Sequence, residues 1–212
     1  MTRADDLMVR CRDDLASATR HPLLRAMTRG RVTTGEFQRY AELESTFVTT
    51  ALGLAERARD EERDPAVRRR LDDIVADLAG PQHDYFRRLA EDGVAAPIAG
   101  PRTTDPLTAY VTALAVSHGA PAIAVCFAAA ETLYAIWCAA AARRPRPRPQ
   151  AVQAWIDMHA TVEFAAQAQF WRSLVDRLPI GEVDDATLDA WFLGALEAEN
   201  RFHDAAYEKD AA

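Results

Sequence analysis

The chemistry that this sequence offers is concentrated in glutamates that interrupt apolar helical patterns. Glu131 is the single charged residue between Pro121 and Ala142, a run in which ten of 22 residues are alanine. A lone carboxylate among apolar side chains is costly unless it is paired, ligated or protonated. We therefore expect Glu131 to be the chemical centre of the protein. The structural alternative is that it only hydrogen-bonds a neighbouring helix.

Two further glutamates fall on aromatic faces of expected helices. Glu44 follows Phe37 and Tyr40 in three- and four-residue steps, which predicts that it lies on the inward face of a long helix. Glu199 falls within the aromatic face of the last helix. For Glu44 the ordinary alternative is an ion pair with an arginine from a neighbouring helix.

Histidines supply the other candidate ligands. His83 lies close to the apolar stripe of its helix, where a single histidine is more often a satisfied core residue than a ligand. His159 and Glu163 are one helical turn apart, a spacing that suits a metal but is also an ordinary pair on a helix surface. Convergence with other ligands would decide between these two interpretations.

The elements that must position these residues are helices. Apolar periodicity and capping residues predict a bundle of seven to eight helices whose main segments are about 4–18, a short helix after His21, 34–61, a helix from Asp64 through Leu89, a helix from Pro106, 121–142, 150–177 and 184–207. We expect residues 93–104 and the proline-rich run 143–150 to be loops. No strand alternation or glycine-rich phosphate loop is present. The fold class is therefore all-α, with a site in the core of an antiparallel bundle.

Composition narrows the class of partner. The chain has 212 residues, of which 49% are hydrophobic, and this suits one domain over residues 1–212. A net charge of −7 argues against nucleic acid or an anionic membrane and favours a small molecule. The run from Pro121 to Ala142 could span a bilayer by length, but its alanines and Glu131 disfavour insertion. Three cysteines without metal or disulfide spacing, and a start without a signal peptide, predict a cytoplasmic protein.

Several motifs in order resemble one known family over nearly the whole chain. They are His21-Pro22, Gly30, Phe37-Gln-Arg-Tyr40 with an acidic residue four further on, Ala109-Tyr110, Trp155-Ile156-Asp157, and Glu199-Asn-Arg-Phe202-His-Asp-Ala-Ala-Tyr207. Together they resemble the TenA/thiaminase II family, whose members share the haem-oxygenase-like helical fold. The resemblance implies a hydrolase of aminopyrimidines, of the thiamin-salvage type, with aromatic side chains around the ring. It also implies a homodimer or homotetramer.

The resemblance assigns residues to that pocket. Glu44 matches the acidic residue on the long helix, Tyr110 a pocket tyrosine, and Glu199 with Phe202 the closing Glu-x-x-Phe motif. Glu131 stands where most members have the active-site cysteine. Two other departures from the family pattern are Phe47 and His159, which stand where tyrosines are usual, and they imply different hydrogen bonding in the pocket.

The resemblance and the chemistry of carboxylic acids together predict a division of roles. Three like charges in one cavity disfavour full ionisation, so we expect at least one carboxyl to be protonated, which gives an acid and a base in the same cavity. We expect Glu131 to activate water, Glu199 to protonate the departing amine, and Glu44 to bind an amidine-like N–H edge. Tyr110, Tyr134 and Phe202 would flank the ring. This mechanism needs no cofactor.

Two alternatives remain open. The first is an iron-dependent oxidase or oxygenase of the same fold, with His83, Glu131, His159 and Glu163 as ligands. Gly80 stands where the acid of a Glu-x-x-His ligand motif would be required, which counts against it. The second is a relative that binds a ligand without catalysis.

Overall fold

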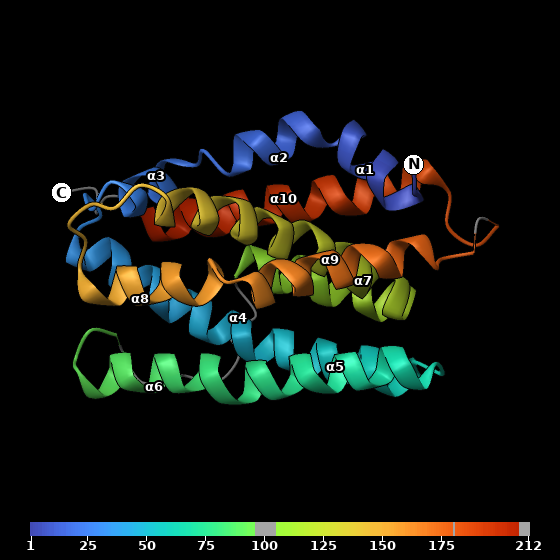
Figure 1. Ribbon diagram of the computed structural model, residues 1–212, viewed down its shortest axis with the longest axis horizontal. Helices are drawn as coiled ribbons and strands as arrows, with labels where there is room; N and C mark the ends of the chain where they lie inside the picture. Colours follow the sequence, from blue (N-terminus) through green and yellow to red (C-terminus); the bar gives the residue numbers. More distant parts are fainter. Residues whose placement is uncertain (96–104, 180, 208–212) are drawn as a thin grey trace.

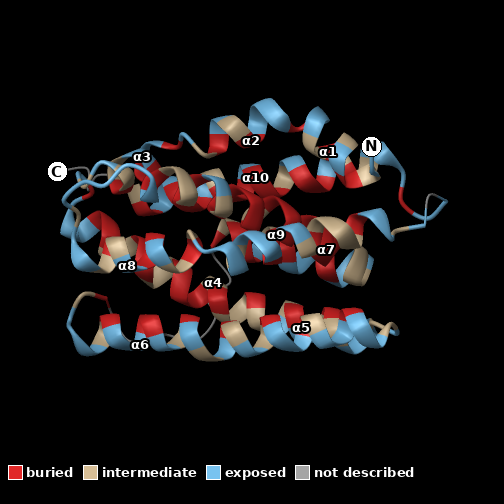
Figure 2. Cartoon of the chain, in the orientation of Figure 1, coloured by how far each residue is buried: buried red, intermediate tan, exposed pale blue. Residues whose placement is uncertain are grey.

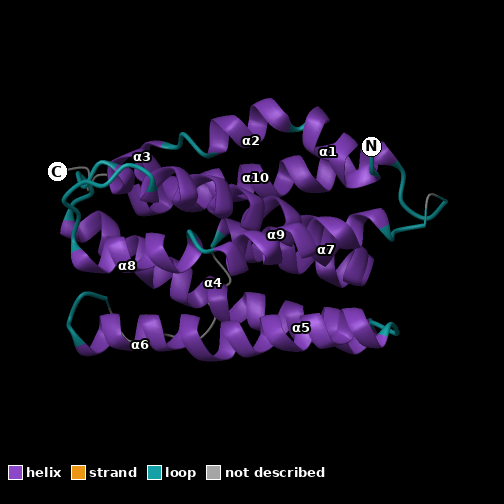
Figure 3. Cartoon of the chain, viewed as in Figure 1, coloured by secondary structure: helices purple, strands orange, loops and turns teal. Residues whose placement is uncertain are grey.

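The protein is helical throughout the part of the chain that its computed structural model describes, residues 1–95, 105–179 and 181–207 (Figures 1 and 3). Within these ranges the helices, and the π-helical turn η1 between α5 and α6, are α1 (Arg3–Arg10), α2 (Arg12–Ala18), α3 (Pro22–Thr28), α4 (Thr34–Glu61), α5 (Pro65–Asp77), η1 (Leu78–Gln82), α6 (His83–Glu91), α7 (Pro106–Ala142), α8 (Gln150–His159), α9 (Val162–Asp176) and α10 (Asp185–Tyr207). The all-α prediction is confirmed. The expected loop 93–104 lies outside the described residues from 96 onward.

Most helix starts follow from local hydrogen bonding. The Thr33 side chain accepts from the backbone N–H of Glu36, and the Glu36 side chain accepts from the N–H of Thr33, a capping box that begins α4 where the sequence predicts. Asp64 before Pro65 and Asp105 before Pro106 accept from the first free N–H groups of α5 and α7.

Three expected helices are divided in the structure, and the one predicted from Asp64 through Leu89 consists of α5, η1 and α6. The helix predicted over 4–18 is interrupted at Cys11, which separates α1 from α2. The helix predicted over 150–177 is interrupted because Thr161 takes an extended conformation and caps α9 through the N–H of Phe164. Conversely, two helices predicted as separate, one before and one after residue 120, form the single helix α7. This helix is kinked at Gly119, where φ is 64°.

α7 is the centre of the bundle. It packs against α10, α9 and α4, while α5, η1 and α6 line the outer side of α4 and α1 and α2 cover α10 (Figure 1). By length and composition α7 could cross a membrane, yet 83% of its most apolar window is buried inside the protein, as in a core helix. Burial is concentrated where these helices face one another (Figure 2).

The proline-rich connection 143–150 packs closely against the backbone of Gly30. Gly30 has φ of 64°, and a Cβ there would lie 2.2 Å from the carbonyl oxygen of Pro147. We expect Gly30→Ala to lower the free energy of unfolding by about 2 kcal/mol or more, because it adds left-handed strain to a backbone clash. Urea unfolding measures this change. Gly53→Ala is the matched control, and should raise stability by about 0.5–1 kcal/mol, since no described atom lies within 4 Å of its Cβ position in α4.

Candidate functional site

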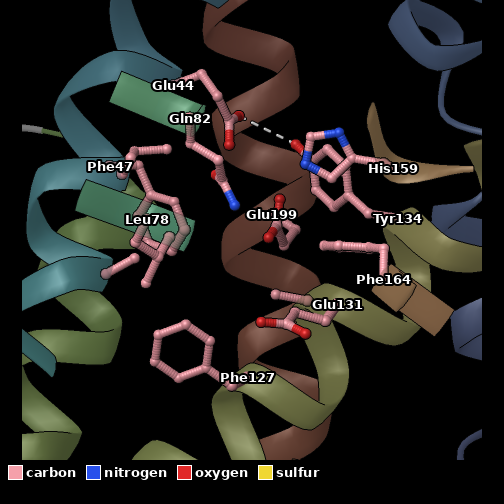
Figure 4. Close-up of a pocket in the computed structure, with 13 residues that line it drawn as sticks. Glu44, Phe47, Leu78, Gln82, Phe127, Glu131, Tyr134, His159, Phe164 and Glu199 are labelled. Atoms are coloured by element: carbon pink, nitrogen blue, oxygen red, sulfur yellow. Dashed lines mark hydrogen bonds between the residues drawn. The ribbon is translucent and has the colours of Figure 1, made fainter. Parts of the chain in front are cut away.

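A cavity between α4, η1, α7 and α10 gathers the buried glutamates (Figure 4). The cavity volume is about 50 Å³, and the cavity is partly open to solvent. The wall is mostly apolar and aromatic, and the polar groups are few. The lining residues are Glu44, Phe47, Val48, Ala51, Leu78, Gln82, Phe127, Ala130, Glu131, Tyr134, His159, Phe164 and Glu199.

Glu131 is held from one side by α9. Its Oε1 accepts hydrogen bonds from Nε2 of Gln167 and Nε1 of Trp171, each at 2.9 Å. Its Oε2 is buried and has no hydrogen-bond partner among the described residues. Burial raises the pKa of Glu131 to about 8, even though the two donors lower it. The fixed oxygen orients the carboxyl group and leaves the other oxygen for a ligand or water.

Glu44 and Glu199 complete a set of three buried acids. Oε2 of Glu44 accepts a hydrogen bond from the hydroxyl of Tyr134 at 3.1 Å, and burial raises the pKa of Glu44 to about 8 (Figure 4). Glu199 is 1% exposed, and neither of its oxygens has a hydrogen-bond partner within the described chain. Burial, followed by the charge of Glu44, raises the pKa of Glu199 well above its usual range. These carboxyls therefore carry protons readily near neutral pH.

His159 contributes a neutral imidazole ring to the same cavity. Its Nδ1 lies 2.9 Å from the carbonyl oxygen of Trp155, so Nδ1 carries the proton and donates it. Burial lowers the pKa of His159 to about 4. The ring is therefore neutral, and Nε2 is available as a hydrogen-bond acceptor.

The structure divides the five expected substrate-binding residues. Phe47, Tyr134 and His159 line the cavity. Phe202 is fully buried behind Phe47, with ring centroids 6.4 Å apart, so it supports the wall without lining it. Tyr110 is placed elsewhere, because its hydroxyl donates to the backbone carbonyls of α10 at positions 190 and 191. The expectation that Tyr110 lines the pocket is corrected on this ground.

The expected iron ligands are not assembled. Glu131 and His159 both line the cavity, but His83 does not, and Glu163 is exposed on the outer side of His159. Within the described ranges, no group of three or more His, Cys, Asp or Glu side chains has the arrangement of a metal site. The residues present therefore do not fit an iron centre, and we derive no step through one.

Sequence reasoning missed the residues that act on Glu131 from another helix. Gln167 and Trp171 are four residues apart on α9, and this i, i+4 spacing was the available signal. Gln82 also escaped notice. Its side chain enters the cavity from η1. This π-helical turn contains Pro81, and sequence periodicity does not reveal it.

The cavity offers aromatic surface and groups that can exchange protons. Phe47, Phe127 and Phe164 offer aromatic surface. The carboxyls offer both a proton donor and, when ionised, a proton acceptor. The cavity thus brings groups that can act as acid and base together from facing helices of an all-helical protein.

Comparison with known proteins places the chain more closely. The model of the TENA/THI-4/PQQC family matches residues 10–209, and the chain belongs to this family. Among curated proteins the search found no significant match.

Solved structures share the fold at low sequence identity. A TenA homologue from Pyrococcus furiosus is 15% identical with a TM-score of 0.84, over 97% of this chain and 100% of that one. A protein described as a TenA family transcription regulator from Silicibacter sp. TM1040 is 12% identical with a TM-score of 0.84, over 98% and 97%. A putative TenA-like thiaminase from Sulfolobus solfataricus P2 is 15% identical with a TM-score of 0.73, over 96% and 95%. The haem-oxygenase-like helical fold is thereby confirmed.

Proposed function

We propose that this protein is a TenA-type hydrolase that cleaves a C–N bond in an aminopyrimidine or a related small molecule bearing an amine or amide. The observation that carries the proposal is the set of buried carboxyls around one cavity. Oε2 of Glu131 and both oxygens of Glu199 are buried without hydrogen-bond partners in the described part of the chain. Buried polar atoms left unpaired reduce stability, so their retention supports use with a ligand.

Each carboxyl has a distinct task in this mechanism. Ionised Glu131 takes a proton from water through Oε2 while the water oxygen attacks the carbon that bears the amine. Glu199, kept protonated by burial, gives its proton to the departing nitrogen. Glu44 binds the N–H edge of the substrate, with its Oε2 oriented by Tyr134.

The relatives support the substrate class. One structural neighbour is described as a putative TenA-like thiaminase, which fits a pocket for a flat nitrogen heterocycle between aromatic side chains. We further propose that the protein acts in the cytoplasm on a small molecule, needs no cofactor and forms a homodimer or homotetramer. Exposed apolar side chains on α7 and α10, namely Val116, Ile136 and Leu193, are consistent with self-association.

Turnover on a panel of compounds tests the proposal. The purified protein is assayed with thiamin, aminopyrimidines carrying an aminomethyl group, and their formylated forms, by following product and released amine. We expect turnover of at least one aminopyrimidine, unchanged after treatment with a chelator. Turnover that requires added iron and oxygen would favour an oxidase instead. Binding of these compounds without turnover would indicate a non-catalytic relative.

A further inference from the structure

A buried histidine lies behind the cavity on the same helix as Glu199. His203 follows Glu199 by four residues on α10, is fully buried, and places its Nε2 3.8 Å from Oε2 of Glu199. Nδ1 of His203 and both oxygens of Glu199 have no hydrogen-bond partner within the described residues. Two neighbouring buried groups with unused polar atoms weaken the native state. The pair therefore calls for a chemical role.

His203 also connects Glu199 to Glu44. Its Nε2 lies 3.4 Å from the hydroxyl of Tyr134, and that hydroxyl is 3.1 Å from Oε2 of Glu44. Since burial raises the pKa of Glu44 to about 8, this carboxyl carries a proton at neutral pH. In the structure the Tyr134 hydroxyl donates to Oε2 of Glu44. When Glu44 is protonated this bond can reverse, so that Glu44 donates to the oxygen of Tyr134 and Tyr134 donates to Nε2 of His203. The chain of contacts can therefore be polarised from Glu44 toward Glu199.

We propose that His203 returns a proton to Glu199 after each catalytic cycle, taking it from Glu44 through Tyr134. The inference rests on the proposed function, in which the C–N bond breaks, its electron pair stays on nitrogen, and Glu199 loses its proton to that nitrogen. The proton of Glu44 moves to Tyr134 as the hydroxyl proton of Tyr134 moves to Nε2 of His203. Nε2 then gives that proton to Oε2 of Glu199.

The proton balance closes over one cycle. Glu131 takes one proton from water, and one proton leaves on the amine by way of Glu199. The proton on Glu131 returns to Glu44 through water in the emptied cavity, which both residues line. Glu199 lines the same cavity, and the route through His203 gives its Oε2 a second source of protons that does not depend on water entering the cavity.

The surroundings of His203 favour this direction of transfer. The titratable groups that face it are His21 before α3, Tyr40 and Glu44 on α4, Tyr134 on α7 and Glu199 on α10. Burial, followed by the charge of His21, lowers the pKa of His203 to about 3, so the ring is neutral at rest. Once Glu199 is ionised, its charge 3.8 Å away favours a protonated His203.

His21 is unsuited to supply the proton. Its Nδ1 accepts the backbone N–H of Leu23, and its Nε2 lies 3.0 Å from Oδ1 of Asp204. Both ring nitrogens of His21 are therefore engaged away from His203. The rings of the two histidines only pack together, with centroids 5.2 Å apart.

His203→Gln separates proton transfer from packing and hydrogen bonding. Glutamine keeps a polar atom near the position of Nε2 and accepts from Tyr134, but it does not take up a proton near neutral pH. We expect one product per site to form at the wild-type rate, followed by a steady state at least tenfold slower. Wild-type protein should show no such burst. Rapid-quench kinetics with excess of the panel compound that is turned over measures both phases.

A second variant guards against loss of folding at position 203. Tyr134→Phe removes the relay hydroxyl and also its hydrogen bond to Glu44, so the first turnover should slow, and the steady state should be at least tenfold slower than that first turnover. Tyr85→Phe is the matched control, since its buried hydroxyl donates to the carbonyl of Ala151 at 3.0 Å, away from the relay. It should behave like wild type. A steady state equal to the first turnover in both His203→Gln and Tyr134→Phe would overturn the relay.

The tautomer of His203 tests the inference without any assay of activity. The relay requires the resting proton on Nδ1, so that Nε2 can accept. Nitrogen NMR of wild-type protein labelled in its five histidines, with His203→Gln to assign the signal, determines this. A resting proton on Nε2 would overturn the relay. If no panel compound is turned over, the proposed function fails, and this measurement still decides the inference.

Discussion

Glu131→Gln will lower kcat by about 10²- to 10⁴-fold, the contribution expected of a general base, while KM changes little. Glutamine can still accept from Gln167 and Trp171 through its amide oxygen, so the side chain stays in place. What it loses is the ability of Oε2 to take a proton from water. Steady-state kinetics on the panel compound that is turned over measures the effect.

Glu163→Gln is the control that separates this mechanism from a metal site. Glu163 is exposed and lies outside the cavity, so its variant should retain wild-type kcat within about twofold, as surface changes usually do. Equal losses in both variants would instead point to shared ligation of a metal. More than a third of wild-type kcat in Glu131→Gln would remove Glu131 as the base.

The prediction for Glu131 also fixes the direction in which the rate changes with pH. Glu131 must be ionised to act as a base, and burial raises its pKa to about 8. The rate of the first turnover should therefore rise about tenfold per pH unit below that value and level off above it. Glu131→Gln should lose this dependence.

The double variant Glu44→Gln/Glu131→Gln will be stabilised relative to wild type as pH rises. In the folded state burial raises the pKa of each carboxyl from 4.5 to about 8. Between these unfolded and folded values, the folded protein binds more protons than the unfolded chain. Folded stability is then lost as pH rises through this window. The two groups together should cost wild type about 3 kcal/mol between pH 6.5 and pH 8. Urea unfolding at both pH values measures the difference.

The histidines affect wild type and the double variant equally. His159 and His203 have lowered pKa values in the folded state, so in the unfolded chain they still lose protons just above pH 6.5, and this contribution cancels in the comparison. Glu56→Gln/Glu163→Gln, at two exposed positions, is the matched control and should follow wild type. A double variant that loses as much stability as wild type would show that the two acids are not held neutral by burial.

Local sequence determined the helices and the inward glutamates. The capping box at Thr33, the Asp-Pro starts of α5 and α7 and the apolar periodicity depend on contacts within a few residues, so they could be predicted from the chain itself. Glu131 and Glu44 could be singled out because a carboxylate on an apolar face is costly wherever the helix packs. The family resemblance, confirmed by the family model, added the expectation that they share a pocket.

Only the tertiary structure decided which atoms meet. A helical pattern gives the face of a side chain but not the helix opposite it or the height at which the two cross. For this reason Tyr110 was assigned to a cavity that it does not line, whereas Gln167 and Trp171 were overlooked as donors to Glu131. The link from Glu199 through His203 was equally hidden, because it joins side chains of α10, α7 and α4.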